Sequence, residues 1–519
     1  MAGTRNSKPA RPSRLAVPAA VVLLAAISAF AVWWFYRNGQ LYWYGDAEAH
    51  LKIARRIFDS RTPGYRQIGT VWLPLLHVLI LPLVRYDALW HNGLAGSIPA
   101  AASYVLAGAF LFAAVRRMLG ASPAWVALAL FALNPNLLYL QSTAMTEAVF
   151  FACLMAMLYF GVLYRDTQSY LALLAAAVAS IAASLTRYEG WFLIPFAALY
   201  FLLAAKRNRL VAAAVYGAVA SLGVLYWLAH NRYQFGEFLY FATCQYSPVA
   251  IQGGKSYPGL HDWSKAWLYF RTAARLCCGA PLLWLGLAGA AAAALLRRSL
   301  WPVILLTLPA VFYILSMHST GGTPIYVPGL WPGTYYNTRY GLMLLPLLAF
   351  GGAGLAALAP ERVRRWCGLA IVAAALSPWL VNPAPEAWVT WKESQINSQG
   401  RRAWTRQAAD FLRPLYRRGA GIYTTSSDLV AIWRAMPMPL SETLTEDNEL
   451  VWEAAFYRPD LFLHEEWAVC MGGDAVQTVL TRARRPYPNY PEYTLVNTIV
   501  VKGAPVVEIY RRFTPAELP

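Results

Sequence analysis

The chain has 519 residues, of which 58% are hydrophobic and only 13% are charged. A soluble domain has about 25% charged residues, so the composition excludes a soluble globular protein and predicts a polytopic membrane protein. The formal net charge is +18, which would also suit a nucleic-acid-binding protein. In a membrane protein, however, basic cytoplasmic loops and attraction to anionic lipids account for such an excess. We therefore expect contact with membrane lipids and no nucleic acid.

Apolar segments predict about eleven transmembrane helices. Basic residues follow every second segment, as the positive-inside rule expects for a cytoplasmic N-terminus and a C-terminus outside. No small-residue cleavage site follows the first segment, so we interpret it as a retained helix and not as a signal peptide. The expected ranges are 15–36, 92–115, 122–140, 144–163, 169–186, 190–205, 210–229, 279–296, 300–317, 340–358 and 366–382.

One further apolar segment, 71–84, breaks this pattern because it is short and contains Pro74 and Pro82. A segment of this length is more often interfacial than spanning, so we place it in a large first outer loop, 37–91. The other long polar loops fall on the same side, and the sequence shows no internal repeat. This asymmetry favours an enzyme at the extracytoplasmic face of the plasma membrane over a transporter.

After residue 382, glycine, proline and charged residues become more frequent and no further span appears. We expect a transmembrane domain over 1–382 and an extracytoplasmic α/β domain over 383–519. Two β-branched runs joined at Lys502-Gly503 indicate a hairpin. The expected strands are 421–425, 461–464, 493–501 and 505–510, and the expected helices run to Arg434 and over 475–484.

The six cysteines give weaker information. Cys153 and Cys367 lie in or beside apolar helices, and we expect them to pack there. On this topology Cys244 faces the oxidising side, where it could form a disulfide with Cys277 or Cys278. The sequence contains no cysteine spacing typical of a zinc site.

Two acidic residues stand directly after the first apolar segment, in Gly45-Asp46-Ala47-Glu48. Ionisable groups at a bilayer are costly and usually functional, and residues two apart cannot share one helix face. We expect Asp46 to face a cavity as a general base, and Glu48 to make a structural contact or to touch a substrate. The alternative for Asp46 is the N-cap of a helix over 48–58.

A second acid and several cations lie at other outer helix ends. Glu147 begins the fourth helix, where it suits the helix dipole or a cavity opposite Asp46. Arg187 and Arg339 lie in outer turns against the positive-inside trend, which points to an anionic ligand such as a phosphate. For Arg187, an ion pair with Glu189 is the alternative. Lesser candidates for phosphate or substrate contact are Arg66, Lys52 and Tyr340.

A metal site is a further option. His50 follows Asp46 by four residues, so the two side chains would meet if their helix began early. Together with Glu147 they could hold a divalent metal, although no sequence spacing fixes such a site. We expect no cofactor and no resident metal, and we name Asp46, His50 and Glu147 as the ligands if one binds.

These motifs together resemble the GT-C glycosyltransferases, in particular the protein O-mannosyltransferases and the bacterial aminoarabinose transferases. The resemblance rests on the acidic motif at 45–48, an amphipathic helix over 51–58, the Trp72–His77 segment and Glu147. It extends to the Arg339-Tyr340 pair that precedes Pro346. Two departures are visible: Ala47 separates acids that are commonly adjacent, and Val71-Trp72 stand where some relatives place a lysine. Because that lysine is absent, arginines would have to bind the donor phosphate.

The resemblance implies a polytopic GT-C-like fold of about eleven helices with a C-terminal α/β domain. It also implies an inverting transfer of a hexosyl or pentosyl group from a polyprenyl-phosphate sugar to an acceptor protein, lipid or glycan. In that reaction Asp46 would act as base, Glu147 would orient hydroxyl groups, and Arg339, Arg187 and Arg66 would hold the donor phosphate. The alternatives are a metal-dependent oligosaccharyltransferase with a diphosphate-linked donor, a lipid-linked-sugar flippase, and a non-catalytic scaffold.

Overall fold

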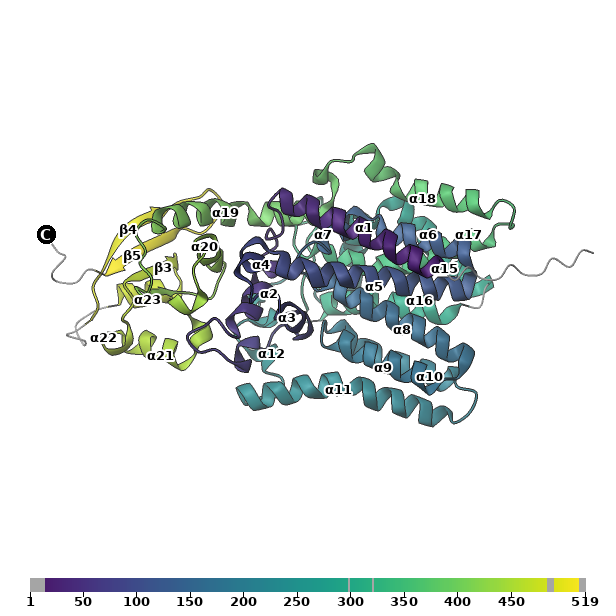
Figure 1. The fold of residues 1–519 in the computed structure, drawn as a ribbon, viewed down its shortest axis with the longest axis horizontal. Coiled ribbons are helices and arrows are strands. Elements are labelled where there is room, and N and C mark those ends of the chain that lie inside the picture. The colour runs from purple at the N-terminus through teal and green to yellow at the C-terminus, as the bar shows by residue number, and fades with distance from the viewer. Residues whose placement is uncertain (1–14, 297–298, 320–321, 483–489, 513–519) are drawn as a thin grey trace, which may run out of the picture.

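The computed structural model describes residues 15–296, 299–319, 322–482 and 490–512. A helical bundle forms one part of the elongated molecule, and a small sheet domain forms the other (Figure 1). We call residues 389–512 the C-terminal domain. Within the described residues, six helices are long and apolar enough to cross a membrane, or seven if one bent helix pair counts as a single span.

Each of the eleven predicted ranges contains an α-helix, but their number as spans stays a prediction. Three of these helices, α6, α9 and α10, have only 12, 15 and 16 residues, fewer than the ~20 that a bilayer crossing needs. The helices of the bundle are α1 Ala16–Arg37, α5 Leu94–Leu119, α6 Ala121–Ala132, α7 Pro135–Leu140, α8 Glu147–Thr167, α9 Tyr170–Ser184, α10 Glu189–Ala204, α11 Arg209–Phe235, α14 Trp263–Cys278, α15 Ala280–Leu296, α16 Leu300–His318, α17 Leu345–Leu358 and α18 Arg364–Val381.

The predicted helix over 122–140 is wrong as a single element, because it is broken into α6 and α7. Pro135 opens α7, and the side chain of Asn134 caps it by accepting a hydrogen bond from the backbone N–H of Leu137 at 3.1 Å. A proline that follows a polar cap favours a new helix over continuation of the old one. Two further short helices, α12 Tyr240–Thr243 and α13 Pro248–Gln252, lie between α11 and α14.

The loop over 37–91 contains α2 Gly45–Arg56, η1 Tyr65–Ile68, α3 Leu75–Ile80 and α4 Asp87–Asn92. The apolar segment 71–84 forms only the six-residue α3 and does not span, as its length predicts. Helix α2 begins earlier than expected, at Gly45, with Tyr44 as its N-cap residue. The alternative role of Asp46 as N-cap is therefore wrong, since Asp46 lies inside the first turn.

The C-terminal domain contains a five-stranded sheet with strand order β2-β1-β3-β5-β4. Strand β1 pairs in parallel with β2 and β3, whereas β5 is antiparallel to β3 and β4. The strands are β1 Ile422–Thr424, β2 Thr443–Leu444, β3 Trp467–Met471, β4 Tyr493–Ile499 and β5 Val507–Arg512. The helices are α19 Val389–Leu412, α20 Val430–Ala435, α21 Leu450–Tyr457, α22 Pro459–Phe462 and α23 Ala475–Thr481. The single-turn 3₁₀ helices before and within it are η3 Pro385–Ala387, η4 Leu440–Glu442 and η5 Glu446–Asn448.

The predicted hairpin is confirmed as β4 and β5, and Gly503 in its turn has φ +75°. The predicted strand over 461–464 is wrong, because Pro459 starts helix α22 there. The strand begins instead at Trp467 and pairs on both sides, with β1 and with β5. The disulfide that Cys244 could form with Cys277 or Cys278 is absent, since all six cysteines are free. Cys277 instead packs against the backbone carbonyl of Thr338.

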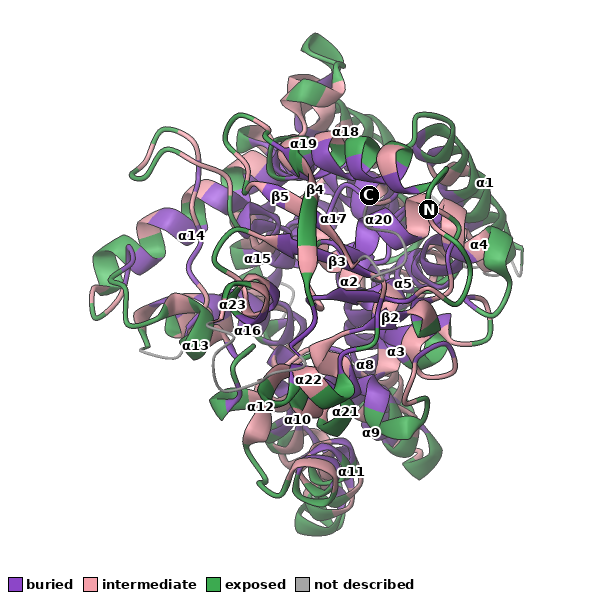
Figure 2. Cartoon of the chain, turned by 90° about the vertical axis from the view of Figure 1, so that its left-hand side faces the viewer, coloured by how far each residue is buried: buried purple, intermediate pink, exposed green. Residues whose placement is uncertain are grey.

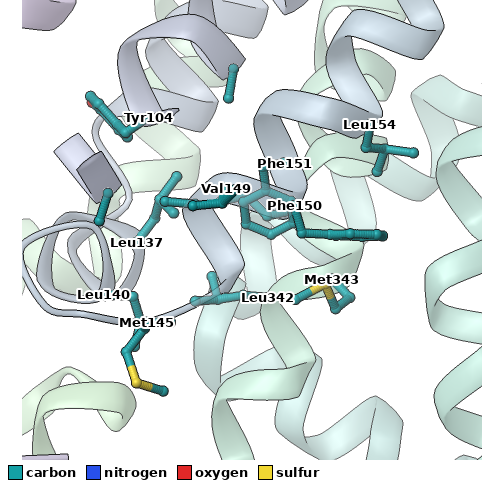
Figure 3. Packing of buried hydrophobic residues seen from close by; sticks show 14 of the residues in the cluster. Tyr104, Leu137, Leu140, Met145, Val149, Phe150, Phe151, Leu154, Leu342 and Met343 are labelled. Atoms are coloured by element: carbon teal, nitrogen blue, oxygen red, sulfur yellow. The ribbon is translucent and has the colours of Figure 1, made fainter. Parts of the chain in front are cut away.

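The hydrophobic core runs through the centre of the bundle, where α5, α7, α8 and the 3₁₀ helix η2 Thr338–Leu344 meet (Figure 3). Tyr104, Leu137, Phe151 and Leu342 are among the fully buried side chains of this region. Viewed from the C-terminal domain, buried residues occupy the middle of the molecule and exposed ones its rim (Figure 2). Packing in this core thus fixes the positions of η2 and of the start of α8.

Helices α15 and α17 are in close contact where Gly289 of α15 meets Gly351 of α17. A Cβ placed on Gly289 would lie 1.9 Å from the carbonyl oxygen of Gly351. Without a driving force from water, helices in a membrane associate through such close backbone packing of small residues. This contact fixes α17, which directly follows η2.

We predict that Gly289→Ala lowers the stability of the purified protein, because the added methyl group forces the two backbones apart. Overpacking of this kind costs roughly 1–3 kcal/mol. Thermal unfolding in detergent measures the effect. The control is Gly217→Ala on α11, where the nearest atom to the new Cβ is a side-chain carbon 4.0 Å away. Equal melting temperatures for the two variants would contradict the prediction.

Candidate active site

Arg339, in η2, lies at the centre of the site and contacts three carboxylates from distant parts of the chain. Its Nη2 donates to Asp46 of α2, and its Nη1 donates to Glu393 Oε1 of α19 at 2.9 Å. Its Nε lies 3.3 Å from Glu147 Oε1 at the start of α8. The backbone N–H of Arg339 also donates to Glu393 Oε2 at 3.2 Å. One buried guanidinium therefore joins the loop after α1, the bundle and the C-terminal domain.

Arg187 reaches the same acid from the turn between α9 and α10. Its Nε donates to Glu189 Oε1 at 2.7 Å, and its Nη1 lies 3.3 Å from Glu147 Oε1. Glu147 is thus shared by both arginines. The ring of Tyr340 lies between them, with its centroid 5.3 Å from the Cζ of Arg187 and 5.0 Å from that of Arg339. The alternative predicted for Arg187, an ion pair with Glu189, is present.

Only one carboxylate around Arg339 is open to solvent. The side chain of Asp46 is 38% exposed, whereas those of Glu147 and Glu393 are 0% and 1% exposed. Asp46 faces a cavity of about 980 Å³ between the bundle and the C-terminal domain. Segments from α2, residues 66–72, residues 244–246, the loop after β1 and the start of α21 line this cavity. A molecule in the cavity would meet Asp46 and no other acid of this cluster.

Glu48 makes a structural contact. It is buried, and Arg434 of α20 donates to both of its oxygens, at 2.6 and 3.2 Å. The two acids of the motif therefore divide as their spacing predicts, with Asp46 at the cavity and Glu48 in a bridge to the C-terminal domain. This bridge fixes the orientation of α2, and with it Asp46.

We predict that Arg434→Met destabilises the protein, because it leaves the buried Glu48 carboxylate without its partner. Breaking a buried ion pair from one side costs roughly 3–5 kcal/mol. The double variant Glu48→Gln/Arg434→Met removes both charges and should recover most of the loss. Chemical or thermal unfolding of the two variants in detergent checks this order. A double variant as unstable as the single one would contradict it.

His50 and the proposed metal ligands are arranged differently from the prediction. Nδ1 of His50 lies 2.9 Å from Nε2 of His77, and burial lowers the pKa of His50 to about 4. Although α2 starts early, His50 therefore bonds to His77 and not to Asp46. Nowhere in the described ranges do three His, Cys, Asp or Glu side chains gather as metal ligands. The trio of Asp46, His50 and Glu147 is not assembled.

Part of the cavity wall belongs to the C-terminal domain. Lys52 Nζ donates to Ser426 Oγ at 2.8 Å and lies 3.8 Å from Asp447, which also pairs with Arg56. Burial lowers the pKa of Lys52 and raises that of Glu446 to about 7. Lys52 is therefore engaged in holding the two domains together.

Glu446 makes the stability of the folded protein depend on pH. Its pKa rises from 4.5 to about 7 on folding, so the folded state keeps a proton that the unfolded state releases. Stability should therefore fall as pH rises from about 4.5 to about 7, by roughly 1–2 kcal/mol after allowance for partial exposure. Glu446→Gln should flatten this dependence in melting curves measured across that range. The control is Glu449→Gln, and an unchanged slope in the Glu446 variant would contradict the prediction.

Sequence reasoning missed the part of the site that the C-terminal domain supplies. Glu393 lies on α19 among the buried polar residues Thr390, Ser394 and Ser398. Their spacing places them on one helix face, and such a polar stripe at helical spacing is the signal that could have found Glu393. Of the predicted phosphate ligands, Arg66 also contacts the C-terminal domain, through Glu449 Oε1 at 2.5 Å.

Comparisons with known proteins give one family match over part of the chain and several similar folds. Residues 87–231 match the family model described as dolichyl-phosphate-mannose-protein mannosyltransferase. No curated protein sequence is significantly similar to the chain. Among solved structures, the fold is similar to that of ArnT from Cupriavidus metallidurans bound to undecaprenyl phosphate, with a TM-score of 0.57 and 15% identity over 94% of this chain and 97% of that one.

A second crystal structure of the same ArnT, in the apo state, has a TM-score of 0.52 and 16% identity over 95% of this chain and 98% of that one. The oligosaccharyltransferase AglB from Archaeoglobus fulgidus, in complex with an inhibitory peptide and a dolichol-phosphate, has a TM-score of 0.50 and 14% identity over 97% of this chain and 75% of that one. The family match covers residues 87–231 alone, and the fold over nearly the whole chain is similar to the folds of ArnT and AglB. The predicted fold class, a GT-C-like helical fold with a C-terminal α/β domain, is thereby confirmed, whereas the number of eleven spans stays a prediction.

Proposed function

We propose that the protein transfers a sugar from a polyprenyl-phosphate donor to an acceptor hydroxyl, with inversion, and that Asp46 is the base. The observation that carries this proposal is the exposure of Asp46. It alone among the acids around Arg339 opens on the cavity, while Glu147 and Glu393 are enclosed. A general base must reach the proton that it removes.

In the proposed reaction, the acceptor oxygen attacks the anomeric carbon from the face opposite the phosphate. Its proton passes to the Asp46 carboxylate as the bond between the anomeric carbon and the phosphate oxygen breaks. The leaving polyprenyl phosphate is already a stable anion, so catalysis needs mainly orientation and a positioned base. Arg339 orients Asp46 through its guanidinium, and Glu393 and Glu147 hold Arg339 from behind.

The structure favours Arg66 over the other two arginines as the group that meets the donor phosphate. Arg339 and Arg187 are enclosed by carboxylates, and removing a buried charge from its partners costs several kcal/mol. Arg66 lines the same cavity as Asp46, and both it and its partner Glu449 are more than one-third exposed. An exposed ion pair contributes only ~0–1 kcal/mol, so a phosphate can replace Glu449 at little cost.

The likeness to ArnT bound to undecaprenyl phosphate and to AglB in complex with a dolichol-phosphate supports a lipid-linked donor. We place the cavity at the extracytoplasmic face, because the basic loops of the bundle predict that orientation. The acceptor is a protein, lipid or glycan that carries a hydroxyl group.

A metal-dependent transferase with a diphosphate-linked donor is the second candidate, and the charge of the site favours it. Four carboxylates, those of Asp46, Glu147, Glu189 and Glu393, surround the two guanidinium groups. Glu147 Oε2 has no hydrogen-bond partner among the described residues. A divalent cation would offset this negative excess, but the carboxylates are bound to the two arginines and do not form a group of metal ligands in the described residues, so this candidate rests on the charge alone.

We predict that Asp46→Asn lowers cleavage of a radiolabelled polyprenyl-phosphate sugar at least about a hundredfold, because the base is lost. Purified protein in detergent is assayed against several donor sugars, with a membrane extract as source of acceptor. The matched control is Asp428→Asn, which removes another acid that lines the cavity and is more than half exposed. Stabilisation by added undecaprenyl phosphate should remain in both variants.

The same assay separates the two candidate functions. Activity that persists in EDTA and disappears in Asp46→Asn supports the metal-independent transferase. Loss in EDTA with recovery on added Mg²⁺ or Mn²⁺ supports the second candidate. Full activity of Asp46→Asn would refute the assignment of the base.

A further inference from the structure

Helix α14 is held at the periphery of the bundle by both of its ends. Trp263, its first residue, stacks on His318, the last residue of the apolar helix α16, with ring centroids 3.9 Å apart. At its other end, α14 continues into the apolar helix α15 through a bend of 107° at Gly279. Because it connects to α15 through this bend and contacts the end of the candidate span α16, α14 lies across the direction of α15. Figure 2, which looks from the C-terminal domain, shows α14 from its side at the periphery.

The outward side of α14 carries two tryptophans followed by two arginines. Trp263, Trp267, Arg271 and Arg275 recur every four residues, which keeps neighbours in this series on one side of the helix. We call these four residues the α14 stripe. The tryptophans are 54% and 50% exposed, and both arginines are exposed. Neither arginine forms an ion pair with a described residue.

A third tryptophan extends the apolar half of the α14 stripe. Trp331 is exposed, and its backbone carbonyl accepts a hydrogen bond from the hydroxyl of Tyr269 on α14 at 2.6 Å. The opposite side of the helix is buried: Ala273 packs against Gly341 of η2, and Ala266 against Gly259. The helix is thus fixed to the protein by one face and presents the stripe outward, together with Ser264 and Lys265 in its first turn.

This arrangement has the chemistry of a membrane interface. Tryptophan rings favour the headgroup level of a bilayer, and the arginine fork matches phosphate oxygens. A 16-residue helix is about 24 Å long, so the stripe extends over several lipid headgroups. The two arginines also lie at the end of the bundle where the charge pattern predicts few cations. Charge complementarity therefore selects an anionic headgroup.

We propose that the α14 stripe is a docking surface for anionic phospholipid headgroups in the leaflet on the side of the C-terminal domain. The inference is independent of the proposed reaction, because the α14 stripe residues do not line the cavity that contains Asp46. A bound leaflet would hold α14, and with it η2, at a fixed depth in the membrane.

The test is titration of purified full-length protein with phosphatidylglycerol or phosphatidylcholine, followed by native mass spectrometry. For the wild type, we expect tighter binding of phosphatidylglycerol than of phosphatidylcholine. For Arg271→Gln/Arg275→Gln, we expect the apparent Kd for phosphatidylglycerol to rise roughly thirtyfold, from ~1 kcal/mol for each basic residue at a lipid surface. Added salt should weaken binding by the wild type and have less effect on the variant.

The matched control is Arg417→Gln/Arg418→Gln, which removes the same charge from exposed positions beyond the far end of α19. The control should bind phosphatidylglycerol like the wild type. Unchanged binding by the Arg271/Arg275 variant, or an equal loss in the control, would overturn the proposal. Equal affinity of the wild type for both lipids would do so as well, and would leave a protein partner as the occupant of the stripe.

Discussion

The structure depends on one buried positive charge, that of the Arg339 guanidinium, which stays protonated. An arginine side chain stays protonated in proteins, so a buried guanidinium has to be met by carboxylates wherever the fold places it. Arg339 finds Asp46, Glu147 and Glu393, which are contributed by the loop after α1, the start of α8 and the first helix of the C-terminal domain. Moving any one of these elements would leave a charge uncompensated. The orientation of the only exposed acid in the group is therefore set by the packing of both domains.

The bundle could be predicted from sequence because each of its helices is specified locally. A run of apolar residues that ends in arginine defines a helix and its direction without reference to any neighbour. The β4–β5 hairpin is local in the same sense, since its turn at Gly503 lies within the segment that it folds. The errors have non-local or single-residue causes. Pro135 interrupts an apolar run, and β3 is selected at Trp467 by its pairing with β1 and β5, which lie far away in sequence.

The same distinction applies to the site. Asp46, Glu147, Arg187 and Arg339 could be found because charge is rare and costly beside a membrane, so each such residue requires an explanation. Glu393, Arg434 and Asp447 lie in the C-terminal domain, where charge is common and carries no such signal. Only the structure shows that Glu393 holds Arg339, that Arg434 holds Glu48, and that Asp447 contacts Lys52 and Arg56. The residues that were missed are those that join the C-terminal domain to α2 and η2.

The balance of charge also distinguishes arginines that hold carboxylates in place from an arginine that is available to a phosphate, whereas the sequence predicts that all three arginines bind the phosphate. Within the cluster, Arg187 and Arg339 face four carboxylates and so provide no excess positive charge for a donor phosphate. Their effect is to hold acids in place at low dielectric, where an unpaired carboxylate would be costly. A phosphate would instead favour the part of the cavity where a cation is held only by an exposed partner, as Arg66 is by Glu449. The cavity would then bind the donor phosphate at η1 and bring the acceptor to Asp46 at the start of α2, with separate residues responsible for each.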